Sequence, residues 1–170
     1  MTNPQIDQAS QIQKMFESKS QRHAVRTDTL FLFAFIFQWC AGILVALIIS
    51  PYTWNRDTGS IHIHIYAAVI LGGIIAVGPI WMIRRRPGTF ASRLVNTVAQ
   101  MLFSMLLIHL TGGRIETHFH VFVSLAFLAS YNDVRLIFGA TVITILDHFL
   151  RGWFWPQSVY GVLSATPWRA

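Results

Sequence analysis

The stretch LFLFAFIFQWCAGILVALIIS, residues 30–50, contains no charged side chain. A helix needs about 20 apolar residues to cross the hydrocarbon core of a bilayer, so this stretch is long enough to span a membrane. Residues 61–83 and 94–113 are also mainly apolar and contain histidines but no Lys, Arg, Asp or Glu. These three stretches predict three transmembrane helices.

Two later stretches, residues 117–132 and 136–146, are also uncharged but shorter. They predict two short or tilted helices joined at residues 132–135. A re-entrant hairpin is the alternative, and it would need other parts of the protein to cover its exposed backbone. We therefore expect an all-α fold: a polytopic membrane helical bundle of about five transmembrane helices, the last two of them short.

The composition supports a membrane protein. Hydrophobic residues make up 54% of the chain and charged residues 12%, whereas soluble domains carry about a quarter charged residues. This argues against a disordered chain and against a soluble enzyme domain. The single cysteine, Cys40, excludes a disulfide framework. The basic residues lie between apolar runs rather than on one face, which indicates a lipid bilayer and not a nucleic acid as the partner.

The distribution of Lys and Arg predicts the orientation, because cytoplasmic loops carry an excess of these residues. With the N-terminus in the cytoplasm, the inner segments hold Lys14, Lys19, Arg22, Arg26, Arg84, Arg85, Arg86, Arg93 and Arg135, and the outer segments hold Arg56, Arg114, Arg151 and Arg169. We expect a multi-pass protein of the bacterial inner membrane. Its parts would be a cytoplasmic tail or amphipathic helix (1–29), the helical bundle (30–151) and an outer interfacial tail (152–170).

This topology brings most of the histidines to the outer ends of four helices. Ionisable groups at membrane depth are costly and usually functional, and imidazole with carboxylate suits Cu, Zn or Fe. The sequence therefore predicts a transition-metal site near the periplasmic face; interfacial histidines that only hydrogen-bond to their neighbours are the alternative. The candidate ligands are His62, His64, His109, Glu116, His118, His120 and His148.

The spacing of these residues restricts the site. His62 and His64, like His118 and His120, are two positions apart and would point about 200° apart on a regular helix. Either the helix entrance is irregular, or one member of each pair is a ligand. Asp147 is expected to orient a ligand imidazole, although a plain ion pair with Arg151 is equally consistent with its position.

Haem b is the alternative cofactor, since two histidines on facing helices could hold its iron axially. Arg56, Arg114 or Arg151 could then pair with the propionates. A membrane metal-dependent oxidoreductase or hydrolase is the alternative function, with Glu116 as a general base. The sequence has no G-x-S-x-G, H-E-x-x-H or P-loop motif, so the pattern favours a binding protein over an enzyme.

Several motifs resemble the N-terminal membrane module of bacterial sensor histidine kinases, chemoreceptors and nucleotide-cyclase receptors. They are LTGGRIETHFHVF (110–122), SLAFLA (124–129), DHFLRG (147–152), FWPQSVYG (154–161) and the His-Ile-His that opens the second apolar stretch. The resemblance implies a sensory, signal-transducing module, expected to be a homodimer. It also implies a further helix and a cytoplasmic output domain, which this sequence does not include.

Overall fold

The structure is a computed structural model that describes residues 4–49, 52–53, 60–61 and 63–161. This part of the chain forms six helices and one short antiparallel pair of strands. The elements are α1 (Pro4–Ile49), β1 (Tyr52–Thr53), β2 (Ser60–Ile61), α2 (Ile63–Arg85), α3 (Phe90–Leu110), α4 (Ile115–Ala129), α5 (Val134–Phe154) and α6 (Gln157–Tyr160). The expected all-helical architecture is confirmed apart from the two-residue strands.

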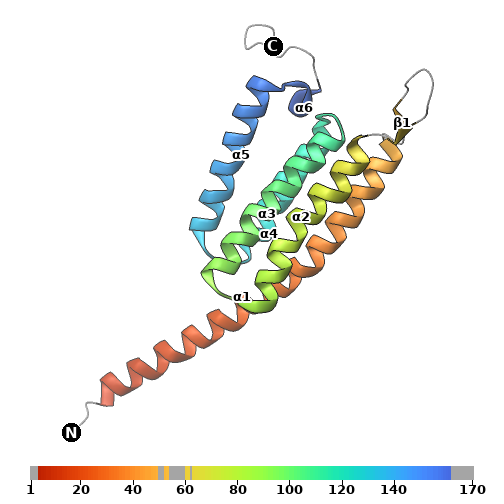
Figure 1. Ribbon diagram of the computed structural model, residues 1–170. Helices are drawn as coiled ribbons and strands as arrows, with labels where there is room; N and C mark the ends of the chain where they lie inside the picture. Colours follow the sequence, from red (N-terminus) through yellow and green to blue (C-terminus); the bar gives the residue numbers. More distant parts are fainter. Residues whose placement is uncertain (1–3, 50–51, 54–59, 62, 162–170) are drawn as a thin grey trace.

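Helices α1 to α5 form a bundle in which the chain reverses direction at each turn (Figure 1). Three helices, α1, α2 and α3, are long and apolar enough to cross a membrane. The expectation of three long apolar spans is therefore confirmed. Helix α4 is shorter, at 15 residues. Helix α5 has 21 residues and is longer than its uncharged stretch, because it begins at the Asp133 cap and continues through Asp147 and Arg151.

Helix α1 is one continuous helix of 46 residues, and its first part extends beyond the bundle (Figure 1). Residues 4–29 of the N-terminal segment are helical in the structure. Ile12, Met15 and Phe16 on this extension are exposed. Contact with the bundle begins near Ala24, and Asp28 is fully buried. The expected boundary at residue 29 thus lies inside an unbroken helix.

The core contains an aromatic cluster that joins α1 to the other helices. Phe31 stacks on Tyr131 with a centroid distance of 5.3 Å, and Phe35 lies 5.9 Å from Phe103. Large apolar side chains also cover the outside of the bundle, for example Phe37, which is 73% exposed. A water-soluble protein rarely exposes so large an apolar surface, whereas lipid solvates it. The molecule is a membrane protein.

A buried carboxylate joins three parts of the bundle at the end where α1 enters. Asp28 is 0% exposed and accepts hydrogen bonds from Gly88 N (2.7 Å), Ser92 Oγ (2.8 Å), Asn96 Nδ2 (3.1 Å) and Tyr131 Oη (2.6 Å). Four donors compensate for the water that the carboxylate loses on burial. Asp28 therefore fastens α1 to α3, to the turn before α3 and to the turn between α4 and α5.

At the other end of the bundle the chain folds back over α3 and α5. Helix α6 packs there with Ser158 and Val159 buried. The close approach depends on Gly113, whose φ is +75° and whose added Cβ would lie 2.5 Å from Gly161 N and Val159 O. Within the expected outer tail, Ser158 and Val159 are thus buried against the bundle, whereas Trp153, Phe154 and Trp155 are exposed. Residues 162–170 lie outside the described residues.

Candidate metal centre

One end of the bundle, here called the histidine end, carries all the candidate site residues that the structure describes. It is the end at which α2 and α4 begin and α3 and α5 finish (Figure 1). His62 lies outside the described residues. The candidates that do lie at this end are His64, His109, Arg114, Glu116, His118, His120, Asp147, His148 and Arg151. His23 is at the opposite end, where its Nε2 is 2.7 Å from Ser130 O.

The first histidine pair joins α2 to α3. The rings of His64 and His109 meet at a centroid distance of 5.2 Å and an interplanar angle of 65°. His109 is held from two further directions: its Nδ1 is 2.8 Å from Ser158 Oγ, and its ring contacts Trp155 at 5.1 Å. Helix α6 and Trp155, which directly follows α5, therefore fix the orientation of His109.

The second histidine pair joins α4 to α5. The rings of His118 and His148 meet at 5.5 Å and 69°. His118 Nδ1 is 2.9 Å from Arg114 O, and His148 Nδ1 is 3.0 Å from Thr144 O. A carbonyl oxygen only accepts, so both Nδ1 atoms donate. In the neutral rings each Nε2 then carries a lone pair, which is the form that binds a metal.

His120 has a different environment from His118, although the two are only two residues apart. Its Nδ1 lies 2.9 Å from Ser104 Oγ and 3.3 Å from Ser124 Oγ, between α3 and α4. Helix α4 is regular from Ile115, so positions two apart point in different directions. His118 therefore contacts His148 of α5, whereas His120 lies between α3 and α4.

The carboxylates of the candidate site also differ from each other. The side chain of Asp147 accepts two hydrogen bonds from Arg151, of 2.6 and 2.5 Å, and its Oδ2 lies 3.5 Å from His148 Nδ1. Asp147 thus forms the ion pair with Arg151 and also contacts His148, a candidate metal ligand. Arg151 Nη1 also donates to Ser158 Oγ at 3.0 Å. Glu116 is exposed at the start of α4.

Within residues 4–49, 52–53, 60–61 and 63–161, no three His, Cys, Asp or Glu side chains are close enough together to hold one ion. At the histidine end, the described histidines form two pairs and one separate ring, and not a single centre. Each pair nevertheless has a suitable spacing. Two imidazoles bound to one tetrahedral ion, with metal–nitrogen distances of about 2.0–2.1 Å, place their ring centroids about 5 Å apart.

Sequence reasoning missed three residues that organise this end and the opposite one. Ser158 contacts both His109 and Arg151, but it lies in the segment expected to be an outer interfacial tail. Ser104 contacts His120, and a serine in an apolar helix is a weak signal. Asp28 was hidden in the polar N-terminal segment; its place directly before an uncharged stretch was the available clue.

No protein-family model and no solved structure matches this sequence. A curated protein of Halobacterium salinarum, "Transducer protein Htr8", is 30% identical to it over 101 residues. The match covers 58% of this chain and 15% of the halobacterial protein, so it involves a small part of that protein's length. Over more than half of its residues, the chain is similar to one segment of a transducer.

Proposed function

We propose that this chain is the membrane-embedded sensory module of a signal transducer, and that a histidine pair at the histidine end binds a transition-metal ion. The similarity to a segment of a transducer protein supports the sensory role. The three long apolar helices place the chain in a membrane. The single observation that carries the metal proposal is the His118–His148 pair, in which both Nδ1 atoms donate to backbone carbonyls.

The proposed topology has five spans with the N-terminus in the cytoplasm. At 1.5 Å per residue, the 21 residues of α5 extend about 31 Å, which is enough to cross the hydrocarbon core. The 15 residues of α4 extend about 22 Å, so α4 would cross where the protein thins the bilayer. The Arg84–Arg85–Arg86 run lies at the end opposite the histidines, and the excess of cations there favours a cytoplasmic position in a bacterial inner membrane.

The geometry favours a bare ion of Cu, Zn or Fe over haem b. Two imidazoles on opposite faces of a haem iron would have centroids about 6 Å or more apart, with the porphyrin between the rings. The observed separations are 5.2 and 5.5 Å, closer to the value for two ligands of one tetrahedral ion. A pair supplies two ligands, and water or a second copy of the chain would supply the others.

The fold offers a route from this site to the cytoplasm. His118 and His148 lie on α4 and α5, and at the opposite end the turn between these helices holds Tyr131, which contacts Asp28 of α1. An ion that drew His118 and His148 together would bind one packing of α4 against α5 more tightly than another. A ligand shifts an equilibrium between two conformations only through such a difference in affinity. We propose that α1 transmits the shift to an output domain in a homodimer.

Metal titration of the purified protein tests the proposal. We expect His118→Ala and His148→Ala each to weaken binding of Cu, Zn or Fe at least tenfold, because each removes one of two imidazole ligands. His23→Ala is the matched control, since His23 lies at the opposite end. Equal affinity in all four proteins would refute the assignment of the site, whereas the sensory role would still be open to a signalling assay.

A further inference from the structure

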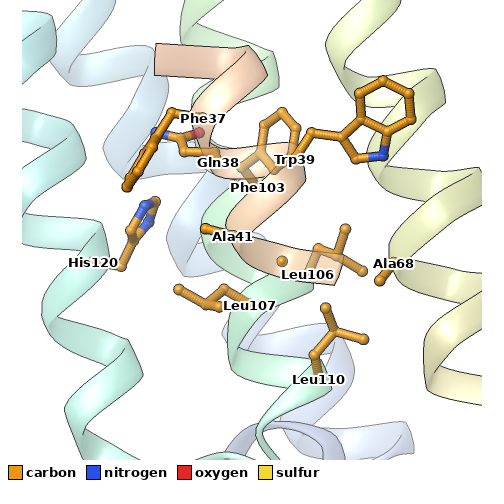
Figure 2. A pocket seen from close by; sticks show the side chains of 11 residues that line it. Phe37, Gln38, Trp39, Ala41, Ala68, Phe103, Leu106, Leu107, Leu110 and His120 are labelled. Carbon is orange, nitrogen blue, oxygen red and sulfur yellow. The ribbon is translucent and has the colours of Figure 1, made fainter. Parts of the chain in front are cut away.

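A groove on the lipid-facing side of the bundle lies apart from the histidine pairs. Residues of α1, α2, α3 and α4 line it, and it encloses about 110 Å³. Figure 2 shows Gln38 of α1 and His120 of α4 at the same side of this groove. Its other walls are apolar, with Phe103 and Leu107 of α3 and Ala41 and Gly42 of α1. Mostly apolar walls with a small number of polar side chains are a common feature of small-molecule sites.

The first polar group is a buried acceptor. Gln38 Oε1 is inaccessible to solvent and makes no hydrogen bond within the described part of the chain. Leaving a buried oxygen without a donor is costly in an apolar environment. Nothing compensates for this cost in the protein itself, so a ligand with a hydrogen-bond donor would be favoured there.

The second polar group is the imidazole of His120. The Ser104 hydroxyl lies 3.1 Å from Gln100 O and 2.9 Å from His120 Nδ1, and when it donates to Gln100 O its oxygen accepts a hydrogen bond from His120 Nδ1. In that tautomer Nε2 is an acceptor, and it makes no hydrogen bond with the described residues. In that tautomer Gln38 Oε1 and His120 Nε2 are both acceptors that have no donor among the described residues, and both belong to side chains that line the groove.

The groove has the size and opening for an aromatic ring with an apolar tail. A cavity of about 150 Å³ lined by Leu, Ile and Phe holds benzene; this groove encloses less, about 110 Å³, but it is open on one side. Phe37 lies at its rim and is 73% exposed, so the groove is reached from the lipid. The tail of a lipid-soluble ligand could remain in the bilayer while its ring lies beside Phe103.

From these observations we infer that the groove binds a lipid-soluble hydroquinone or related phenol, whose hydroxyl groups donate to Gln38 Oε1 and His120 Nε2. The oxidised quinone carries carbonyl oxygens in place of hydroxyls and has no hydrogen to donate. Binding would therefore select the reduced form, and occupancy of the groove would follow the redox state of such a molecule. This inference does not depend on the metal site.

The test is equilibrium binding to the full chain in lipid nanodiscs, without oxygen and with a chelator present. The probes are an alkyl hydroquinone, the matching quinone and the matching alkylbenzene. We expect the hydroquinone to bind about tenfold or more tightly than the other two, and Gln38→Leu to remove that preference. Equal binding of hydroquinone and alkylbenzene would overturn the inference.

Two glycines provide a matched pair of variants. A Cβ added at Gly42 or at Gly139 meets no atom within 4 Å, so either position accepts a larger side chain without a clash at its Cβ. Gly42 lines the groove and Gly139, on α5, does not. We expect Gly42→Leu to abolish hydroquinone binding and Gly139→Leu to retain it, with equal helix content by circular dichroism. Wild-type affinity in a folded Gly42→Leu variant would overturn the inference.

Discussion

Tyr131 and Asp28 are 103 positions apart in the sequence, and Tyr131 Oη donates a 2.6 Å hydrogen bond to Asp28 Oδ1. This contact joins the turn after α4 to α1, the helix whose first part extends beyond the bundle. Burial, reinforced by the hydrogen bond to Asp28, raises the pKa of Tyr131 above its usual value. The phenol therefore stays protonated at neutral pH and remains a donor.

Removing this hydroxyl should destabilise the bundle. In Tyr131→Phe the Asp28 carboxylate stays buried and loses one of its four donors, and we expect a loss of about 1–3 kcal/mol in the free energy of unfolding. Unfolding in mixed detergent micelles measures it. Tyr66→Phe is the control, because Tyr66 is 54% exposed. Equal stability of the two variants would show that the Asp28 contact contributes little.

Asp133 at the start of α5 should make stability depend on pH. The hydrogen bond from Arg135 is the main cause that lowers the pKa of Asp133 in the folded protein. A lowered pKa stabilises the fold above the unfolded-state value of about 3.9, and this contribution is lost as pH falls through the folded-state pKa.

Asp133→Asn separates charge from helix capping, because Asn caps a helix about as well as Asp. We expect the variant to be less stable at neutral pH by about 1 kcal/mol or less. The difference from the wild type should disappear in strong acid. Thermal unfolding at several pH values measures this, and a difference that persists or grows in acid would contradict the assignment.

Gly112 and Gly113 should respond differently to alanine. Both have a positive φ, of +67° and +75°, which strains any side chain. An alanine Cβ at Gly112 meets no atom within 4 Å, whereas one at Gly113 would collide with Val159 O. Gly112→Ala should cost about 1–2 kcal/mol from backbone strain alone, and Gly113→Ala should cost more and undock α6.

Hydrogen–deuterium exchange separates these two effects. Undocking of α6 should speed the exchange of amides in Gln157–Tyr160 in Gly113→Ala and leave them protected in Gly112→Ala. The same undocking would release Ser158 from His109. Equal protection of α6 in the two variants would mean that the crowding at Gly113 does not hold it.

The sequence predicted the long helices well, because a run without charges has few other stable arrangements. Residues 30–50 are enough to identify the apolar part of α1, and alternation of direction then brings His64, His109, His118 and His148 to one end. These steps need only the length of each apolar run and the order of the helices along the chain.

The contacts of individual side chains could not be predicted from the apolar runs and the order of the helices. His118 and His120 differ by two positions, and which of them meets α5 depends on the rotation of α4 against its neighbours. That rotation is set by packing, for example by Leu128 at the centre of the core. The burial of Asp28 also depends on packing and could not be predicted from the sequence, because its donors Ser92 and Tyr131 come from distant parts of the chain.

X-ray absorption at the metal edge tests the paired-histidine site most directly, because it counts the imidazole ligands around a bound ion. For zinc, copper or iron bound to the wild-type chain, we predict at least two imidazole nitrogens at about 2.0–2.1 Å, and one fewer in His148→Ala. A metal shell with no imidazole, or the same shell in His148→Ala as in the wild type, would contradict the account.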